Sequence, residues 1–448
     1  MITKLKWKNH PILGNLELSL TNALGKPYNT VILAGENGTG KTTILDTLST
    51  FLNLGTFNAF EYIEYNIEDC IYHIYSQSES NASFGFHHRK NLNDNTEKYI
   101  NSNKNINRDY INNDLFDIRH YGFAYSKARS GFNTKKVTST TTQQLDQSKY
   151  DNDEKDDFTS IKQLLVDIDE QDNSAWMKIC TTHQGKTLED FQISSKTYRF
   201  KNAFNNFFDK LQFQEVDNTA LDEKKIIFSK NGRSIFIDDL STGEKQIVFR
   251  GTQLLRNANT MDNSIILIDE PELSMHPRWQ NKILPYYRNL FTKNSIQSSQ
   301  LIIATHSEYV LRSALKDKDN ILIIILNDKN GLITSKTITA PNVLPTITAA
   351  ETNYLAFNVA SIDYHIELYG YLQLKEIKPY IKDCDDFIYN HPLFDPAKHS
   401  KPSSHGSIHY NTLPTYIRNA IDHPDSGNRF TDNELRTSIE FLKQLLKD

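Results

Sequence analysis

The sequence predicts a mixed α/β domain followed by a small α-helical domain. Several short, fully apolar segments have the length and composition of buried parallel strands, and segments with helical spacing lie among them. These apolar segments are residues 30–34, 265–268, 301–304 and 321–326. Beyond about residue 346 the strand signals stop, and the rest of the chain has the pattern of helices. We therefore expect an α/β domain over 1–345 and an α-helical domain over 346–448.

The first part of the α/β domain combines a strand, a helix and a long polar stretch. The strand 30–34 ends at a glycine-rich segment, and residues 42–54 then have the pattern of a helix. Residues 56–116 are polar and aromatic without helical spacing, and nine Asn fall between positions 91 and 113. Residues 118–125 have strand-like character, and 135–157 is a second polar stretch. Such a composition favours turns and buries little apolar surface. We interpret 56–157 largely as an insertion.

A helical subdomain and a hairpin are expected next. Residues 158–209 turn helical, with apolar residues at i, i+3, i+4 and i+7 from Ile161 to Ile168. Residues 225–238 alternate in polarity around Asn231-Gly232, which is a strong signal for a two-residue hairpin turn.

Charge and cysteine content exclude several classes of protein. Among 448 residues, 50 Lys and Arg face 55 Asp and Glu, so the net charge is −5. This argues against coating nucleic acid by bulk charge, although a local basic patch remains open. The three cysteines form no CxxC pair, which fits a reducing cytoplasm better than a disulfide framework. The first residues lack the apolar core of a signal peptide, and no apolar run is long enough to span a membrane.

The segment Gly35–Thr42 matches the phosphate-loop pattern GxxxxGK[ST] in full, between a strand and a helix. Glycines let the backbone approach a phosphate with its N–H groups turned inward, and the helix N-terminus adds a positive partial charge. Lys41 reaches the β- and γ-phosphates in this motif, and the Thr42 hydroxyl binds Mg²⁺. The cofactors predicted are therefore ATP and Mg²⁺, bound by Asn37, Gly38, Gly40, Lys41, Thr42 and Thr43.

Three further motifs follow in a fixed order. Residues 240–246 read LSTGEKQ, the strand 265–268 ends in Asp269 and Glu270, and a later strand is followed by His306. Adjacent carboxylates at a strand end suit metal binding and activation of a water molecule. Taken alone, the first of these motifs would also suit a plain helix N-cap.

In this order the motifs resemble those of ABC ATPases, over about residues 1–345. The resemblance implies that Asp269 holds Mg²⁺, Glu270 orients or deprotonates the attacking water and His306 contacts the γ-phosphate. It also implies an ATP-closed homodimer, or a higher even-numbered oligomer, in which Ser241 and Gly243 of one copy approach the γ-phosphate held by another. The chain reveals no aromatic residue to stack on adenine and no assignable Q-loop glutamine.

The subfamily is indicated by the segment 270–277, Glu-Pro-Glu-Leu-Ser-Met-His-Pro. It resembles the SMC, RecF and OLD group of ATPases rather than transporter subunits. Lys41 and Ser241 are too close in sequence for the long coiled-coil arms of true SMC proteins. Residues 125–129 are similar to a Tyr/Arg segment of the compact members, with an ordinary basic loop as the alternative. The whole resembles the Septu-type and retron-associated ATPases of bacterial antiphage defence, which work beside an HNH nuclease.

A second candidate site lies in the α-helical domain. Arg418, Asn419 and His423 resemble the RxxxxH motif of HEPN ribonucleases, in which Arg and His cleave RNA without a metal. Three interpretations stay open: a ribonuclease site, a degenerate HEPN-like docking domain, or side chains that satisfy the last carbonyls of a helix.

The leading hypothesis is an antiphage ATPase that gates a nuclease, either its own HEPN-like site or a partner HNH nuclease, with RNA or DNA as the nucleic acid. The alternative is a DNA-repair or recombination ATPase without its own nuclease. No membrane partner is expected.

Overall fold

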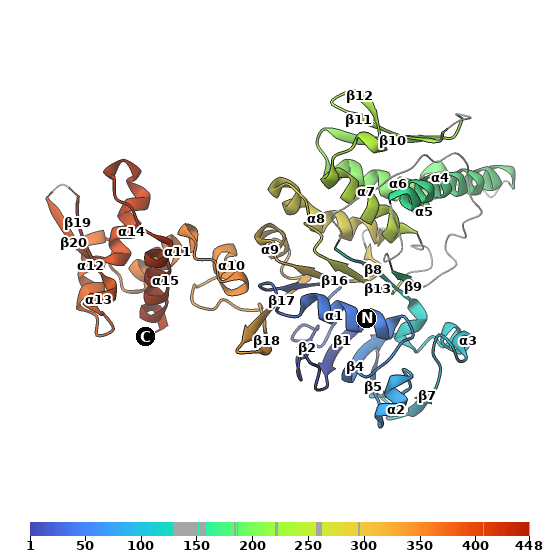
Figure 1. Ribbon diagram of the computed structural model, residues 1–448, viewed down its shortest axis with the longest axis horizontal. Helices are drawn as coiled ribbons and strands as arrows, with labels where there is room; N and C mark the ends of the chain where they lie inside the picture. The colour runs from blue at the N-terminus through green and yellow to red at the C-terminus, as the bar shows by residue number, and fades with distance from the viewer. Residues whose placement is uncertain are drawn as a thin grey trace. The chain divides into compact units, whose positions relative to one another are not determined.

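The fold is described from a computed structural model (Figure 1). It describes residues 1–128, 150–152, 158–182, 185, 187–219, 223–256, 262–293, 296–405 and 407–447. The chain folds into two compact units, Met1–Thr337 and Ile338–Asp448. The domain boundary expected from the sequence, between 345 and 346, falls a few residues later than this division. None of the helices within the described residues is both long and apolar enough to cross a bilayer.

A seven-stranded sheet forms the centre of the first unit, in the order β18-β17-β3-β16-β13-β8-β9. Neighbouring strands from β17 to β9 pair in parallel, and β18 pairs antiparallel with β17. Every residue of β3, β13 and β16 is buried, as expected for parallel strands covered on both faces. The strands are β3 (Thr30–Ala34), β8 (Phe123–Ser126), β9 (Tyr150–Asn152), β13 (Ile265–Asp269), β16 (Gln300–Thr305), β17 (Ile321–Lys329) and β18 (Leu332–Thr337).

Helices and a second sheet cover the central sheet. Side chains on one face of it, such as Val31 and Leu33, share a core with helix α1 (Lys41–Leu52) and the second sheet. Helices α7 (Thr242–Leu255), α8 (Pro277–Leu290) and α9 (Glu308–Leu315) follow β12, β13 and β16 along the chain, and α7 contacts β8 while α9 contacts β17 and β3. A short hairpin, β14 (Thr292–Lys293) and β15 (Ile296–Gln297), follows α8. The predicted mixed α/β class is confirmed for this unit.

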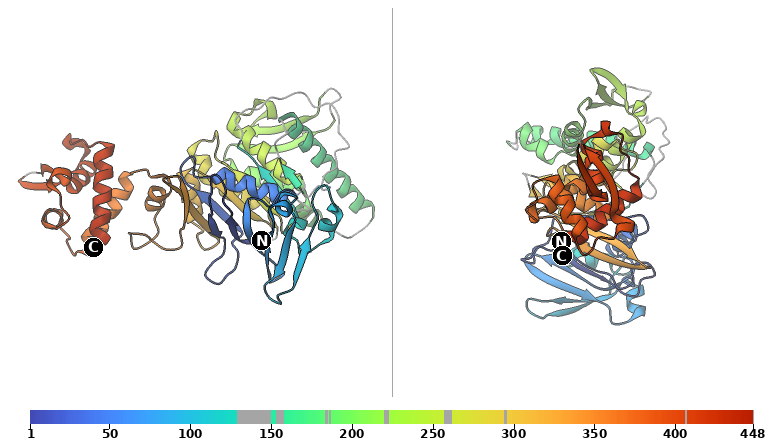
Figure 2. Two further views of the ribbon diagram at one scale, coloured as in Figure 1. Left: turned by 60° about the horizontal axis from the view of Figure 1, so that its bottom comes forward. Right: turned by 90° about the vertical axis from the view of Figure 1, so that its left-hand side faces the viewer.

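The second sheet corrects the interpretation of 56–157 as an insertion that buries little. Strands from 60 to 100 join the first two strands in a six-stranded antiparallel sheet, ordered β2-β1-β4-β5-β6-β7. Its strands are coloured from blue to cyan in Figure 2. Ile63, Tyr65 and Ile74 of these strands are fully buried in the shared core. The strands are β1 (Ile2–Trp7), β2 (Glu17–Ser19), β4 (Phe60–Ile67), β5 (Cys70–Tyr75), β6 (His87–Asn91) and β7 (Glu97–Ile100). Two short helices and a 3₁₀ turn follow or interrupt them: α2 (Glu79–Ser83), α3 (Arg108–Asn113) and η1 (Ile118–Tyr121).

Helices occupy the predicted helical subdomain, and a small sheet follows it. The helices are α4 (Phe158–Thr181), α5 (Leu188–Ser194) and α6 (Lys196–Phe207). The sheet consists of β10 (Leu211–Asp217), β11 (Lys225–Lys230) and β12 (Arg233–Phe236), followed by η3 (Ile237–Asp239). The predicted hairpin is confirmed, because Lys230 pairs with Arg233 across Asn231 and Gly232, which both have positive φ. Most of the polar stretch 135–157 lies outside the described residues.

The second unit is mostly helical, and it also contains a hairpin that the sequence did not predict. The helices are α10 (Ala349–Phe357), α11 (Ile362–Lys375), α12 (Ile381–Asn390), α13 (Pro396–His399), α14 (Leu413–Asp422) and α15 (Asp432–Lys447), with η4 (Pro424–Ser426). The hairpin pairs β19 (Ser400–His405) with β20 (Ile408–Thr412). Its residues are mostly polar and exposed, so no apolar strand signal marks them.

Candidate functional site

The phosphate loop joins β3 to α1, at the carboxyl edge of the central sheet. Two of its glycines are required by close packing. A Cβ atom on Gly35 would lie 2.4 Å from the Leu326 carbonyl oxygen, and one on Gly40 would lie 2.5 Å from Leu13 Cδ2. Gly40 also has a φ of 82° at the N-cap of α1. Asn37 and Gly38 are exposed on the loop, so their N–H groups are accessible to a ligand.

Lys41 lies folded over this loop. Its Nζ donates to the carbonyl oxygens of Gly35 and Glu36, both at 2.8 Å, and the residue is only 7% exposed. Burial lowers the pKa of Lys41, while the nearby carboxylates, Asp269 first among them, oppose this. An anion in the loop would therefore stabilise the charged ammonium that burial disfavours.

Thr42 and Asp269 form the group best suited to a metal ion. The Thr42 hydroxyl donates to Asp269 Oδ2 at 2.9 Å, although the two residues are 227 positions apart. Within the described residues no hydrogen-bond partner reaches the buried Asp269 Oδ1. Burial raises the pKa of the Asp269 carboxyl, against the opposing hydrogen bond from Thr42. A carboxylate with a buried, unpaired oxygen beside a hydroxyl fits Mg²⁺, which prefers such hard oxygen ligands.

Glu270 and His306 lie at the ends of the neighbouring strands β13 and β16. The Glu270 N–H donates to the Ala304 carbonyl oxygen at 2.9 Å, and Glu270 has a φ of 44°. This left-handed backbone conformation is unfavourable for a glutamate and is typical of functional positions. Glu270 Oε1 lies 3.5 Å from His306 Nδ1, and both side chains remain partly exposed. A carboxylate and an imidazole held this close can orient a water molecule and pass a proton.

Glu272 belongs to the site, although its role was not predicted from the sequence. Its buried Oε1 accepts hydrogen bonds from the Thr305 hydroxyl at 2.7 Å and from the His306 N–H at 3.0 Å. The carboxylate therefore ties the loop after β13 to the end of β16 and fixes the backbone that carries His306. The second Glu of Glu-Pro-Glu was the signal that could have identified it.

The LSTGEKQ segment begins helix α7. Ser241 caps the helix, and its N–H and hydroxyl both donate to Glu244 Oε2. Lys230 of the hairpin donates to the other oxygen of Glu244 at 2.8 Å. A Cβ atom on Gly243 would lie 2.8 Å from the Ser274 carbonyl oxygen. No hydrogen bond among the described residues joins Ser241 or Gly243 to the phosphate loop.

Arg250 holds α7 against the ends of β8 and β13, a role that was also not predicted from the sequence. Its guanidinium is fully buried and donates to the Asp269 carbonyl oxygen at 2.7 Å and to the Lys127 carbonyl oxygen at 3.1 Å. Lys127 directly follows β8, which places the described part of the 125–129 segment beside β13. Arg129 lies outside the described residues. A lone Arg in the otherwise apolar run after LSTGEKQ was the available signal.

The candidate site in the second unit is built around helix α14. The Arg418 guanidinium contacts Asp422 Oδ2 at 2.6 Å and donates to Asn419 Oδ1 at 3.1 Å. His423 is the C-cap of the helix, and its ring stacks on His405 of β19, with centroids 4.6 Å apart. No hydrogen bond between Arg418 and His423 occurs in the described part of the chain. Arg418 is thus engaged by its own helix, and His423 by the hairpin.

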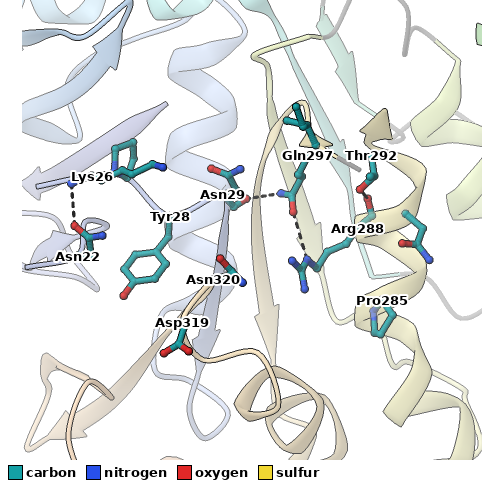
Figure 3. A pocket seen from close by; sticks show the side chains of 13 residues that line it. Asn22, Lys26, Tyr28, Asn29, Pro285, Arg288, Thr292, Gln297, Asp319 and Asn320 are labelled. Carbon is teal, nitrogen blue, oxygen red and sulfur yellow. Dashed lines mark hydrogen bonds between the residues drawn. The ribbon is translucent and has the colours of Figure 1, made fainter. Parts of the chain in front are cut away.

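A cavity of about 690 Å³ opens at the other edge of the central sheet (Figure 3). Asn29 and Asn320, which directly precede β3 and β17, line it together with Arg288. Figure 3 shows the Gln297 side chain bonded to both Asn29 and Arg288. Arg288 also contacts Asp317 at 2.7 Å. The cavity therefore lies at the amino ends of β3 and β17, whereas the phosphate loop follows the carboxyl end of β3, and Asp317 balances the charge of Arg288.

Part of the chain matches a known sequence family. The sequence family described as "AAA domain, putative AbiEii toxin, Type IV TA system" matches residues 77–312. The probable ATPase of retron Ec83 from Escherichia coli is 30% identical over 196 residues, an alignment that covers 40% of this chain and 33% of that protein.

Two further relatives align over more of the chain. The probable ATPase of retron Vc95 from Vibrio cholerae serotype O1 biovar El Tor is 23% identical, covering 71% of this chain and 74% of that protein. Septu protein PtuA from Bacillus thuringiensis is also 23% identical, covering 70% and 74%. Among solved structures, an SMC head bound to the C-winged helix domain of ScpA matches at 14% identity with a TM-score of 0.42, covering 75% of this chain and 98% of that one.

Proposed function

The chain belongs to the AAA-domain family that matches residues 77–312, and from this premise we propose an ABC-type ATPase of antiphage defence whose ATP state gates a nuclease. One observation carries the ATPase assignment. The phosphate loop, Thr42 with the half-paired Asp269, and the Glu270–His306 pair converge at one edge of the central sheet. Relatives among retron ATPases and Septu PtuA support the defence setting.

Nucleotide binding follows from the loop. The N–H groups of Asn37, Gly38, Gly40 and Thr43 would bind phosphate oxygens, helped by the N-terminus of α1. Lys41 would leave the two carbonyl oxygens of the loop and pair with the β- and γ-phosphates. Thr42 and Asp269 would hold Mg²⁺, which neutralises the charge that develops on the transferred phosphoryl group.

Hydrolysis is assigned to the residues at the ends of β13 and β16. The Glu270 carboxylate would orient the attacking water and accept its proton. His306, 3.5 Å from it, would contact the γ-phosphate and hold Glu270 in place. Glu272 would position His306 through its backbone hydrogen bond.

A second copy of the chain would complete the site. Ser241 is exposed at the N-terminus of α7 and is not bonded to the phosphate loop of the described chain. Its hydroxyl and the Gly243 N–H would therefore reach a γ-phosphate held by a partner copy, with the helix N-terminus adding positive charge. We propose an ATP-closed homodimer.

Glu270→Gln tests this assignment. Loss of the carboxylate base should lower ATP hydrolysis by about 100-fold or more, while ATP binding persists and the dimer accumulates. Turnover is measured by phosphate release and the dimer by light scattering. Glu61→Gln, which changes an exposed glutamate of the antiparallel sheet, is the control and should leave both unchanged. Unaltered turnover in Glu270→Gln would remove Glu270 from the mechanism.

The nuclease that ATP gates is proposed to be a separate HNH protein, as the resemblance to Septu and retron systems implies. ATP-driven closing and opening of the dimer would change the surface offered to that partner. The alternative, a DNA-repair ATPase, predicts hydrolysis stimulated by DNA ends and no toxicity in cells. Toxicity that requires both this chain and the nuclease would exclude it.

A ribonuclease in the second unit is the second candidate. The observation in its favour is the stacked pair His405 and His423, which lies at the C-terminus of the helix that carries Arg418. Arg418 would have to exchange Asp422 for an RNA phosphate. His423→Ala should then abolish RNA cleavage and spare ATP hydrolysis. Cleavage that survives this change would leave the histidines with a structural role.

A further inference from the structure

The carboxylate of Glu244 lies at the start of helix α7 and is buried there, because the residue is only 3% exposed. Its Oε2 accepts hydrogen bonds from the Ser241 N–H at 2.8 Å and from the Ser241 hydroxyl at 2.9 Å. Its Oε1 accepts a hydrogen bond from Lys230 Nζ at 2.8 Å. A buried negative charge is therefore bonded directly to the exposed serine that is assigned above to the γ-phosphate of a partner copy.

Glu244 and a γ-phosphate would compete for the same proton. The Ser241 hydroxyl has one proton to donate, and in this structure Glu244 Oε2 accepts it. Phosphate oxygens are acceptors, and one that bonds the Ser241 hydroxyl would lie about 3 Å from it, hence within about 6 Å of Glu244 Oε2. Two negative charges this close repel each other unless a cation balances one of them.

Lys230 is placed by the fold to supply that cation. It ends β11, the middle strand of the small sheet, and the strand is anchored by Phe228, whose ring packs on Phe204 of α6 with centroids 5.3 Å apart. Burial raises the pKa of the Glu244 carboxyl, but the hydrogen bonds from Lys230 and Ser241 outweigh burial and hold this pKa below its usual value. Glu244 is thus charged at neutral pH, and Lys230 balances its charge.

The start of helix α15 in the second unit has the same set of contacts and shows what is special at α7. Thr431 and Glu434 bond each other as Ser241 and Glu244 do, and Lys401 donates to Glu434 Oε1. Such a lysine can therefore simply support a helix start. The Glu434 side chain is 30% exposed, however, whereas that of Glu244 is 4% exposed. Solvent screens the charge of Glu434, but the charge of Glu244 depends on its lysine.

We infer that Lys230 is a positioning residue of the proposed ATP site, because it balances the charge of Glu244 and so lets the Ser241 hydroxyl of one copy donate to the γ-phosphate held by another. This inference rests on the proposed ATP-closed homodimer and extends its site to the β11–β12 hairpin. Lys230 acts through Glu244 and not on the nucleotide. Without Lys230, the unbalanced carboxylate would hold the Ser241 proton and repel the γ-phosphate.

Lys230→Met tests the inference in the full chain, with Mg²⁺ and the non-hydrolysable analogue β,γ-imido-ATP. Light scattering over a range of protein concentrations gives the Kd of the dimer. We expect this Kd to rise by about tenfold or more in Lys230→Met, because two like charges then meet without a cation between them. Binding of the same analogue to the monomer, measured by calorimetry below the dimer Kd, should not change, since the phosphate loop is intact.

Two further variants separate charge from support of the fold. Glu244→Gln added to Lys230→Met removes the unbalanced charge, and glutamine still caps the helix, so the dimer Kd should return to within about threefold of the wild-type value. Lys401→Met removes the lysine from the matched contacts at α15 and should leave the dimer Kd unchanged. Thermal unfolding of each variant records the cost to the fold.

The remaining outcomes overturn the inference. Equal dimer Kd values for Lys230→Met and the wild type would show that the lysine does not act on the site. A defect that Glu244→Gln does not repair, or one that Lys401→Met shares, would leave Lys230 with a structural role only. In all these cases the wild type still forms a dimer and the proposed homodimer stands. A wild type that forms no dimer with the analogue would remove the homodimer and, with it, the role of Lys230.

Discussion

The phosphate-loop site in the first unit joins residues up to 227 positions apart, whereas the candidate site in the second unit joins neighbours on one helix. Thr42 and Asp269 meet because β3 and β13 both end at one edge of the sheet. Arg418 and Asp422 meet because i and i+4 always face each other on a helix. His423, directly after α14, stacks on His405 of β19.

The difference shows how much a short motif reveals about function. Residues brought together by a whole sheet, with a buried carboxylate oxygen left unpaired, are hard to explain by folding alone. An i,i+4 ion pair at a helix end needs no function to explain it. The comparison therefore favours catalysis at the first site.

Asp269→Asn should have the largest effect. Loss of the anionic metal ligand should lower ATP hydrolysis by about 100-fold, a change on the order of 3 kcal/mol in the barrier. Because burial raises the Asp269 pKa, removing this charge should also raise the thermal stability of the nucleotide-free protein. The matched change in the second unit, Asp422→Asn, should leave hydrolysis unaltered. If the two variants hydrolyse ATP equally, the comparison fails.

Arg250→Met should have the next largest effect. It compares Arg250, which contacts distant segments of the chain, with Arg418, which contacts residues of its own helix. The buried Asp269 carbonyl oxygen and the partly buried Lys127 carbonyl oxygen would lose their donors, so the free energy of unfolding should fall by about 3 kcal/mol. ATP turnover should fall by about tenfold, because these oxygens belong to strand ends at the site. Arg418→Met should lower stability by less than about 0.5 kcal/mol.

For Arg250→Met and Arg418→Met, the free energy of unfolding is measured by urea unfolding and ATP turnover by steady-state kinetics. Arg278→Met, at an exposed arginine of α8, is the control for loss of a charge alone. Equal destabilisation by Arg250→Met and Arg418→Met would contradict the distinction between the two sites.

The smallest predicted effect is a loss of stability at acidic pH, which both units should show. Burial lowers the pKa of His87 in the first unit and of His365 in the second unit to about 3. Each histidine is neutral when folded and takes up a proton on unfolding below its ordinary pKa of 6.5. Their contribution to stability is therefore complete above pH 6.5 and is lost as the pH falls toward 3.

Between pH 6.5 and pH 5 each unit should lose about 2 kcal/mol from this source. Proteolysis in urea, with fragments assigned to each unit by mass spectrometry, measures the two losses separately. His365→Gln should remove the acid sensitivity of the second unit only, and His87→Gln that of the first. Sensitivity that is unchanged in both variants would show that other groups are responsible.

The sequence predicted the parts of this fold that local patterns encode. The buried strands were visible as apolar runs, and the hairpin at Asn231-Gly232 as a turn that needs positive φ. The antiparallel sheet was missed because polar residues such as Glu64 and His73 alternate with buried ones, and Asn-rich connections conceal the period. The β19–β20 hairpin was missed because it carries little apolar surface.

By itself the sequence determined the phosphate loop, the carboxylates at the end of β13 and the order of the motifs. Backbone conformation and helix start signals depend on adjacent residues, so a local pattern is enough to reveal these features. Only the tertiary structure decided that Arg250 braces α7 against Asp269 and that Glu272 holds the His306 backbone. Those facts depend on which distant segments pack together, and no local pattern encodes that.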